Sequence, residues 1–359
     1  MEKIIDLKKF WQDKSVLITG HTGFKGIWFS VFLNLLGAKV YGYALKAKKK
    51  SLFRLINTKK IYKKSFIGDI KNFKKLEKAI HYSKPQVIFH FAAQSLVPYS
   101  YQNPKETFET NIFGVLNLLN ILKKNVNTKS VVIITTDKVY KDKKRRIYKE
   151  NDELGGNDPY SASKVCKEII VNSYVESFYN NTYLRNRISI ARSGNVIGSG
   201  DYSKNRLIPD ILSAVKNNKK LLIRNPNHIR PWQHVIEPLY GYLLLAESQY
   251  YGKAKSKLIS WNFGPNKKSF IKVKKILDIF KKITKYKLKI KYYSSKKIKE
   301  TNVLRLSNSK SKKFLKWIPK WDIMESLKKT IELEEVIKKK NVNSLIENQI
   351  IEYLEKKKK

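Results

Sequence analysis

The chain is poor in cysteine and in long apolar runs. Cys166 is the single cysteine among 359 residues, which excludes an internal disulfide framework and fits a reducing compartment. No apolar run approaches the ~20 residues of a membrane-spanning helix. The first residues, Met1 to Asp6, lack the basic segment and apolar core of a secretion signal. We therefore expect a cytoplasmic protein with no membrane partner.

Acidic residues are also scarce, because 29 Asp and Glu stand against 75 Lys and Arg and the formal net charge is +46. Such an excess ordinarily suggests a nucleic-acid partner. The lysines are, however, spread along the whole chain instead of gathering in one stripe, which indicates a general drift of composition. We expect no nucleic-acid partner, and a basic nucleic-acid-binding protein is the alternative from another functional class.

The remaining composition favours a large globular protein without a metal. A chain of 359 residues that is 42% hydrophobic can bury a large core and predicts one large domain with a smaller one. The five histidines are scattered without the spacing of metal ligands. His21 is therefore interpreted as a neighbour of a bound cofactor and not as a metal ligand.

An apolar run followed by three regularly spaced glycines organises the N-terminal part. Residues 16–19 predict a strand, and Gly20, Gly23 and Gly26 follow it. Gly20 permits a tight turn, Gly23 lets backbone N–H groups approach a pyrophosphate, and Gly26 lets a helix over 27–36 pack closely on the strand. The first two glycines are one residue further apart than in the dehydrogenase fingerprint. The flanking strand and helix nevertheless favour a dinucleotide ligand.

The segment after the second predicted strand, 39–43, lacks the acidic residue that dinucleotide folds often place near the ribose. Ala44-Leu45-Lys46 stands there, so the ribose contact stays unexplained, and Lys46 or Lys48 could attract the 2′-phosphate of NADP. Asp69 ends a short strand predicted over 65–70. Its carboxylate could accept from an adenine amino group or could lie in a surface turn.

Two further segments predict buried parallel strands that end in small or polar residues. The first spans 85–94 and ends in Ala92-Ala93-Gln94, and the second spans 131–138 and ends in Thr136-Asp137-Lys138. Open α/β sheets bind ligands at the carboxyl ends of their strands. We therefore expect these two ends in the functional site. The charge run over 141–146 predicts a solvated loop.

Tyr160 and Lys164 lie four residues apart at the start of a long predicted helix over 160–179, so they share one face. An ammonium beside a phenol depresses the pKa of the phenol, which makes it a usable base near neutral pH. A Tyr-x-x-x-Lys pair is common by chance. It gains weight here because it follows a dinucleotide loop.

Four features together resemble the extended short-chain dehydrogenase/reductase family. They are the glycine loop, Ala92-Ala93-Gln94, Asn111 and Tyr160-x-x-x-Lys164. Within that family the chain is similar to the CDP-glucose 4,6-dehydratases over about residues 11–321. The motifs that carry this similarity are GHTGFKG from Gly20, TDK from Thr136, DPYSASK from Asp158, GNVIG from Gly194, RLIPD from Arg206 and IRPWQHV from Ile229.

The resemblance implies an α/β fold, a Rossmann-like doubly wound parallel sheet with a smaller α/β substrate domain on the C-terminal side. It implies an NAD-binding domain over 1–193 with 232–263, and a nucleotide-sugar domain over 194–231 with 264–325. Residues 326–359 would form a C-terminal helix and a basic tail, disordered from Lys356 to Lys359. It also implies a homodimer, for which helices 106–122 and 160–179 carry apolar residues on more than one face.

The same resemblance assigns the site, with NAD as cofactor and CDP-glucose as substrate. The catalytic residues would be Thr136, Asp137, Lys138, Tyr160 and Lys164. The cofactor would contact Gly20, His21, Gly23, Phe24, Lys25, Asp69, Ile70, Ala92, Ala93, Gln94, Asn111, Tyr160 and Lys164. The substrate would contact Asn195, Arg206, Leu207, Arg224, Arg230 and Arg305.

In the implied reaction, Tyr160 takes the proton of the glucose 4-hydroxyl, Lys138 removes the C5 proton and Asp137 protonates the departing 6-hydroxyl. Dehydratases of this kind that act on dTDP-glucose typically have glutamate where this chain has Lys138. A lysine must be neutral to act as a base, so Lys138 could instead orient the diphosphate or stabilise the enolate. A nucleotide-sugar 4-epimerase, or a dehydratase of another nucleotide sugar, is the nearest alternative.

Overall fold

The computed structural model describes residues 2–124, 127–143, 147–180, 182, 184–253, 259–293, 300–337 and 341–356. Seven parallel strands form its central sheet in the order β10-β6-β5-β4-β1-β2-β3. These strands are β1 Ser15–Thr19, β2 Lys39–Ala44, β3 Tyr62–Ile67, β4 Val87–His90, β5 Ser130–Ile134, β6 Ile188–Ser193 and β10 Ser260–Phe263. The predicted doubly wound α/β fold is confirmed, with the strand order reversing between β1 and β4.

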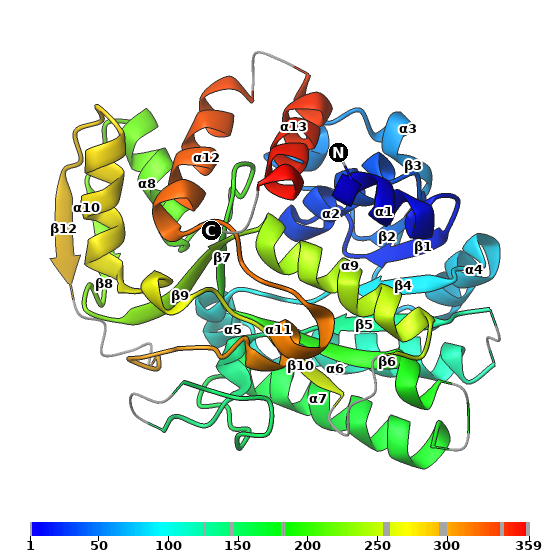
Figure 1. Ribbon diagram of the computed structural model, residues 1–359. Coiled ribbons are helices and arrows are strands. Elements are labelled where there is room, and N and C mark those ends of the chain that lie inside the picture. Colours follow the sequence, from blue (N-terminus) through cyan, green and yellow to red (C-terminus); the bar gives the residue numbers. More distant parts are fainter. Residues whose placement is uncertain are drawn as a thin grey trace.

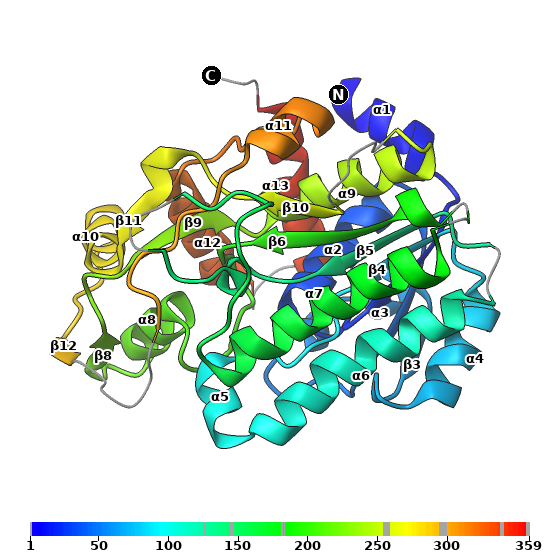
Figure 2. The same cartoon turned by 90° about the horizontal axis from the view of Figure 1, so that it is seen from below.

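Helices cover both faces of the sheet (Figures 1 and 2). One face carries α1 Glu2–Trp11, α2 Phe24–Leu35, α9 Ile236–Tyr250 and α13 Val342–Glu355, and the other carries α4 Phe73–Ser83, α6 Pro104–Leu122 and α7 Pro159–Phe178. Successive strand residues point to opposite faces. In β1, Val16 and Ile18 join the first core, whereas Leu17 joins the second.

Several predicted strands are shorter than their apolar runs suggested. β4 ends at His90 and β5 ends at Ile134. After β5, Asp137–Val139 forms a 3-10 turn in which the Thr136 side chain accepts from the backbone N–H of Lys138. A hydroxyl that bonds its own backbone competes with strand pairing. The polar end of this segment therefore leaves the sheet, as does Asp69, which lies two residues beyond β3.

A smaller part of the chain packs at the carboxyl edge of the sheet. It holds the three-stranded sheet of β7 Asn195–Ile197, β9 Ile229–His234 and β11 Phe270–Lys272, and the pair β8 Leu221–Arg224 with β12 Ile290–Tyr293. Its core is shared by α8 Leu207–Lys216, α10 Val273–Ile283 and α12 Ile323–Val336. The short helices are α3 Thr58–Ile61, α5 Val97–Gln102 and α11 Ser309–Leu315.

The C-terminal region differs from the single helix expected after residue 325. It contains the rest of α12 and all of α13, and α13 returns to pack against α2 of the large sheet. Residues 357–359 of the expected disordered tail and 144–146 of the expected charged loop lie outside the described residues. Among the helices that the structure describes, none combines the length and apolarity that a membrane crossing requires.

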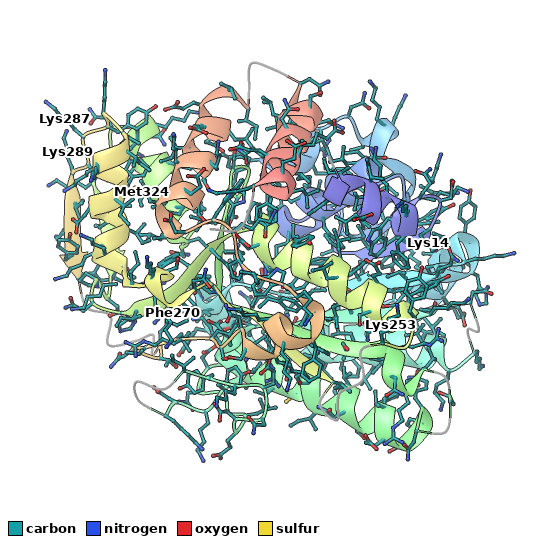
Figure 3. The ribbon with its side chains drawn as sticks, in the orientation of Figure 1. Lys14, Lys253, Phe270, Lys287, Lys289 and Met324 are labelled. Carbon is teal, nitrogen blue, oxygen red and sulfur yellow. The ribbon has the colours of Figure 1, made fainter. Side chains whose placement is uncertain are left out.

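Basic side chains occur at opposite ends of the molecule. Lys14 and Lys253 lie near α1 and α9, whereas Lys287 and Lys289 lie beside α10 and β12 (Figure 3). This placement matches the even spread of lysine along the sequence.

Candidate active site

The glycine loop at the end of β1 has the predicted geometry. Gly20 has a φ of +77°, a conformation that favours glycine. A side chain at Gly20 would place its Cβ 2.8 Å from the Ala92 nitrogen, and one at Gly26 would place it 2.4 Å from the Gly20 carbonyl oxygen. Both glycines therefore permit the close approach of α2 to β1 and β4.

The N-terminus of α2 fits the pyrophosphate of a dinucleotide. A Cβ on Gly23, its N-cap residue, would meet only the Gly20 carbonyl oxygen within 4 Å, which leaves open space beside the helix end. Neither an acidic residue in the first turn nor a capping side chain occupies this end in the described structure. Helix N-termini attract anions through their N–H groups and dipole. The residues present thus match the cofactor that the sequence implies.

His21 and Lys25 leave the loop in different directions. The His21 side chain is buried against β2, where Gly42 makes room for its ring, and its Nε2 lies 2.7 Å from Ser65 Oγ. Burial lowers its pKa to about 4. Lys25 instead donates to Ser193 Oγ at the end of β6, at 2.9 Å. Burial, with Arg206 and Lys164 nearby, lowers the pKa of Lys25 to about 7.

Asn111 on α6 joins the end of β4 to α7. Its Oδ1 accepts from the Gln94 backbone N–H at 3.0 Å, and its Nδ2 donates to the Gln94 carbonyl at 3.1 Å and to Ser163 Oγ at 2.8 Å. The Gln94 side chain donates to the Leu96 carbonyl within its own loop and to Thr107 Oγ1 on α6. Both residues therefore shape the loop that carries Ala92 and Ala93.

Tyr160 lies in the first turn of α7, which Asp158 caps by accepting from the Ser161 N–H. The ammonium of Lys164 is 5.9 Å from the centroid of the phenol ring. The expected depression of the Tyr160 pKa is wrong for the protein alone. Burial raises this pKa to about 12 and outweighs the opposing hydrogen bond with Thr136. Burial also lowers the pKa of Lys164 to about 8.

A buried ion pair anchors α7 one turn beyond Lys164. The Glu168 carboxylate accepts from Thr135 Oγ1 at 2.6 Å and from Arg192 Nε at 3.0 Å. Thr135 follows β5 and Arg192 lies in β6, so this pair fixes the helix against two strand ends. Sequence reasoning missed it, because neither residue belongs to a motif that marks the contact.

Asp137 is buried beside Thr136, whose hydroxyl donates to its Oδ1 at 3.2 Å. Its Oδ2 has no hydrogen-bond partner within the described part of the chain. Burial raises the pKa of Asp137 and outweighs the cations Lys138 and Arg230. The carboxyl is therefore biased toward its protonated form, which a general acid requires.

Lys138 contacts a carboxylate that the sequence did not reveal. Its Nζ lies 3.4 Å from Glu300 Oε1, and Arg230 Nη2 lies 3.8 Å from Glu300 Oε2. Glu300 belongs to no recognised motif and is 162 residues away from Lys138 in the sequence. The packing of β9 against the segment around Val303 brings them together.

The other predicted substrate residues occupy several positions around this edge. Arg206, the N-cap residue of α8, donates to Asp201 at 2.9 Å and reaches Ser95 at 3.4 Å. Asn195 begins β7 beside Trp232 of β9, and Arg224 ends β8. Leu207 begins α8, and the backbone carbonyl of Arg305 accepts from the N–H of Tyr148 at 2.9 Å.

The two predicted adenine-side residues lie in the loop after β3. Asp69 accepts from the Lys71 N–H at 2.9 Å, and Ile70 is buried against Gly114 of α6. Among the residues described, no cluster of His, Cys, Asp and Glu could hold a metal ion.

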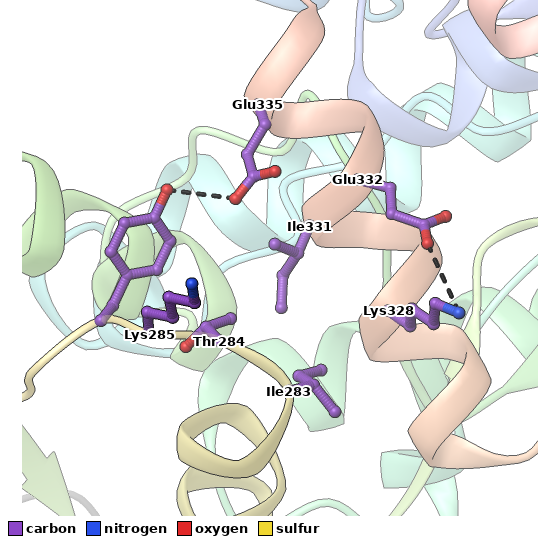
Figure 4. Close-up of a pocket in the computed structure, with 8 residues that line it drawn as sticks. Ile283, Thr284, Lys285, Lys328, Ile331, Glu332 and Glu335 are labelled. Carbon is purple, nitrogen blue, oxygen red and sulfur yellow. Dashed lines mark hydrogen bonds and ion pairs between the residues drawn. The ribbon is translucent and has the colours of Figure 1, made fainter.

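A separate pocket lies between the end of α10 and α12, away from the predicted residues (Figure 4). Ile283 and Ile331 form its apolar wall. The Tyr286 hydroxyl donates to Glu335 at 3.1 Å beside it, and Lys328 and Glu332 form an exposed ion pair at 3.8 Å. None of the five predicted catalytic residues lines this pocket.

Comparison with known proteins gives the chain its family. The family model described as GDP-mannose 4,6 dehydratase matches residues 17–330. The chain belongs to this family. It is 44% identical over 328 residues to a CDP-glucose 4,6-dehydratase of Salmonella typhimurium, a match that covers 89% of this chain and 90% of that relative.

Solved structures of two other nucleotide-sugar enzymes share the fold. A dTDP-glucose 4,6-dehydratase from Bacillus anthracis, in complex with NAD, superposes with a TM-score of 0.76 at 23% identity, over 90% of this chain and 96% of that one. A UDP-glucose 4-epimerase from Thermotoga maritima, with UDP-glucose, superposes with a TM-score of 0.77 at 22% identity, over 88% of this chain and 97% of that one.

The five predicted catalytic residues lie at the carboxyl edge of the central sheet. Thr136, Asp137, Lys138, Tyr160 and Lys164 come from the ends of β5 and the start of α7, as the sequence predicted. The structure adds Ser193, Gly42 and Glu300, each of which contacts a predicted residue. In the sequence, Gly42 is only a residue within a strand and Ser193 only the last residue of a buried strand. Neither position carries a signal that marks it as part of the site.

Proposed function

We propose that this protein converts CDP-glucose to CDP-4-keto-6-deoxyglucose, with NAD as its resident cofactor. The observation that supports this most is the 44% identity to a CDP-glucose 4,6-dehydratase over nearly the whole chain. The product is a precursor class for deoxysugars of cell-surface polysaccharides such as the lipopolysaccharide O-antigen. The reaction has no net redox change, which favours NAD over NADP despite Lys46.

The cofactor would lie across the glycine loop, with its pyrophosphate at the N-terminus of α2 beside Gly23. When bound, NAD would supply the hydride acceptor for oxidation at sugar C4 and, in its reduced form, the hydride donor for reduction at C6. Lys25, Asp69, Ile70, Ala92 and Ala93 would line the cofactor along this edge of the sheet. Phe24 packs against Gly198, which helps to fix the start of the helix.

Tyr160 would take the proton from the glucose 4-hydroxyl during oxidation. Thr136 lies beside the phenol and acts to lower the Tyr160 pKa, and Lys164 places a buried ammonium 5.9 Å from the centroid of the ring. Because burial nevertheless raises the Tyr160 pKa to about 12, ionisation of the phenol would also depend on the charge of the bound cofactor.

Asp137 and Lys138 would carry the elimination that follows. The new C4 ketone acidifies the C5 hydrogen, the C5–H electron pair forms the C5–C6 double bond, and the 6-hydroxyl leaves as water with a proton from Asp137. Lys138 is the proposed acceptor of the C5 proton. Its Nζ lies 3.4 Å from the Glu300 carboxylate, and the alternative role is stabilisation of the enolate by charge.

An epimerase would share the loop, Tyr160 and Lys164 but has no elimination step that requires an acid and a base. The Asp137–Lys138 pair therefore favours a dehydratase. The decisive experiment offers CDP-, dTDP-, GDP- and UDP-sugars in parallel and assays the 4-keto-6-deoxy product. We expect turnover with CDP-glucose. Preferred turnover of another nucleotide sugar, or release of NADP from the denatured protein, would contradict the assignment.

We also propose that the protein is a cytoplasmic homodimer with no nucleic-acid partner. Phe113 of α6 and Ile169 and Phe178 of α7 are 52%, 57% and 48% exposed, and the two helices pack side by side. Such apolar residues support a two-fold four-helix contact. Sedimentation at micromolar concentration tests this, and a monomer would contradict it. Salt-sensitive retention of oligonucleotides without retention of nucleotide sugars would favour the nucleic-acid alternative.

A further inference from the structure

The carboxylate of Glu300 lies among the cations of the sugar side of the site. Lys138 Nζ is 3.4 Å from one of its oxygens and Arg230 Nη2 is 3.8 Å from the other. All three side chains are largely buried, with exposed fractions of 17% for Glu300, 19% for Lys138 and 5% for Arg230. Contacts of this kind are screened far less than surface ion pairs.

The charges around Glu300 favour its ionised form. Burial alone would raise its pKa, but Lys138, Arg230 and Arg224 together lower it. His228 lies against Arg230, with its Nδ1 3.0 Å from Nη2, and burial lowers the pKa of His228 to about 4. Near neutral pH the imidazole adds no charge, so the Glu300 carboxylate interacts with three cations, two of which, Lys138 and Arg230, also interact with the buried Asp137. Arg224 also interacts with Asp210.

Two of these cations, Arg224 and Arg230, are among the arginines expected to contact the diphosphate-bearing substrate. A carboxylate and a phosphate present the same kind of acceptor to a guanidinium group. A diphosphate and the Glu300 carboxylate therefore require the same donors.

We propose that Glu300 is the internal counter-anion of the diphosphate subsite, and that it competes with the incoming nucleotide sugar for Arg230, Arg224 and Lys138. This inference rests on the proposed function only in taking the ligand to be a nucleoside diphosphate. Substrate binding is then an exchange of anions, which weakens the hold of Glu300 on Lys138 and leaves the lysine to the sugar. Glu300 is a positioning residue in this scheme, because it acts through Lys138 and the arginines.

The test measures binding without chemistry. Dissociation constants for CDP and for inorganic pyrophosphate are determined by calorimetry on the NAD-loaded wild type, Glu300→Gln and Glu300→Asp. Glu153→Gln is the matched control, since Glu153 pairs with Lys141 at the surface. We expect Glu300→Gln to bind both probes about tenfold more tightly, the size of one partly screened charge interaction. Glu300→Asp should resemble the wild type, and the control should not change.

A residue with a purely structural role would not improve binding when it is removed. Unchanged or weaker binding of both probes by Glu300→Gln would overturn the proposal. Weaker binding of CDP with unchanged pyrophosphate would overturn it too, and would assign Glu300 to the nucleoside. If the wild type ignores CDP but Glu300→Gln still gains affinity for pyrophosphate, the role of Glu300 stands and the CDP-glucose assignment fails. Thermal unfolding of each variant confirms that it is folded.

Discussion

Glycines and a helix N-terminus form the cofactor half of the proposed site, whereas charged side chains from distant segments form the sugar half. In the first half, Gly20 and Gly26 let backbone atoms approach one another, and the proposed binding groups are main-chain N–H donors. In the second half, Lys138 and Arg230 both contact the carboxylate of Glu300. Substitutions in the cofactor half should therefore alter cofactor binding, whereas substitutions in the sugar half should alter catalysis or anion binding.

Tyr160, where the two halves meet, should give the largest effect. Tyr160→Phe keeps the ring and removes the phenol, so the cofactor should stay bound while oxidation at C4 slows by roughly 10²- to 10⁴-fold, the usual loss for a general base. Single-turnover absorbance of the reduced cofactor measures this rate. Near-normal turnover would reject the role of Tyr160.

Lys138 tests the chemistry of the sugar half alone. If Lys138 is the base, Lys138→Ala should oxidise C4 normally, accumulate reduced cofactor and lose C5 exchange with deuterated solvent by about 10²-fold or more. Exchange is measured by NMR of the sugar. Exchange at the wild-type rate would reject the base assignment and leave Lys138 an electrostatic role.

Gly26 tests the cofactor half alone. In Gly26→Ala the new Cβ would lie 2.4 Å from the Gly20 carbonyl oxygen, and forcing the loop apart should cost about 1–3 kcal/mol. We expect loss of bound NAD on dialysis and weaker rebinding by about tenfold or more. Gly252→Ala is a surface control, since a Cβ there meets nothing within 4 Å. It also controls for backbone strain, because the φ of +67° at this position is unfavourable for alanine. Equal NAD retention in Gly26→Ala and the wild type would contradict the loop's role.

His21 gives the smallest effect, on stability. Its pKa is lowered by burial to about 4 in the folded chain and is near 6.5 in the unfolded chain. Between about pH 4 and pH 6.5 the imidazole of His21 is protonated mainly in the unfolded chain and neutral in the folded chain. The free energy of unfolding therefore falls as the pH drops from 6.5 to about 4. His21→Gln should flatten this slope only in part, because burial lowers the pKa of His228 and His234 as well. Urea unfolding at several pH values measures the slope, and an unchanged slope would contradict the assignment.

The sequence predicted the strand, glycine turn and helix of the cofactor half because their signals are local. Three glycines, one strand and one helix specify the loop within eleven residues, and Tyr160 and Lys164 share a helix turn. The sugar half was predicted only in part. Asp137 and Lys138 were recognised, but Glu300 is brought to Lys138 by tertiary packing, which no spacing reveals.

The pKa of Tyr160 was mispredicted for a related reason. The i and i+4 spacing predicts that Tyr160 lies near Lys164, but it does not predict that the phenol is buried. Burial of the phenol raises its pKa to about 12. The direction of such a shift depends on the balance between a neighbouring charge and the loss of water. That balance is a property of the folded site.

In the proposed reaction one sugar passes through C4 oxidation, elimination and reduction at C6 without leaving the site. The direct measurement uses CDP-glucose that carries deuterium at C4, with the product examined by NMR and mass spectrometry. We expect CDP-4-keto-6-deoxyglucose with the deuterium at C6, and with solvent hydrogen at C5. Deuterium retained at C4 in an epimerised sugar, or deuterium lost to solvent, would contradict it.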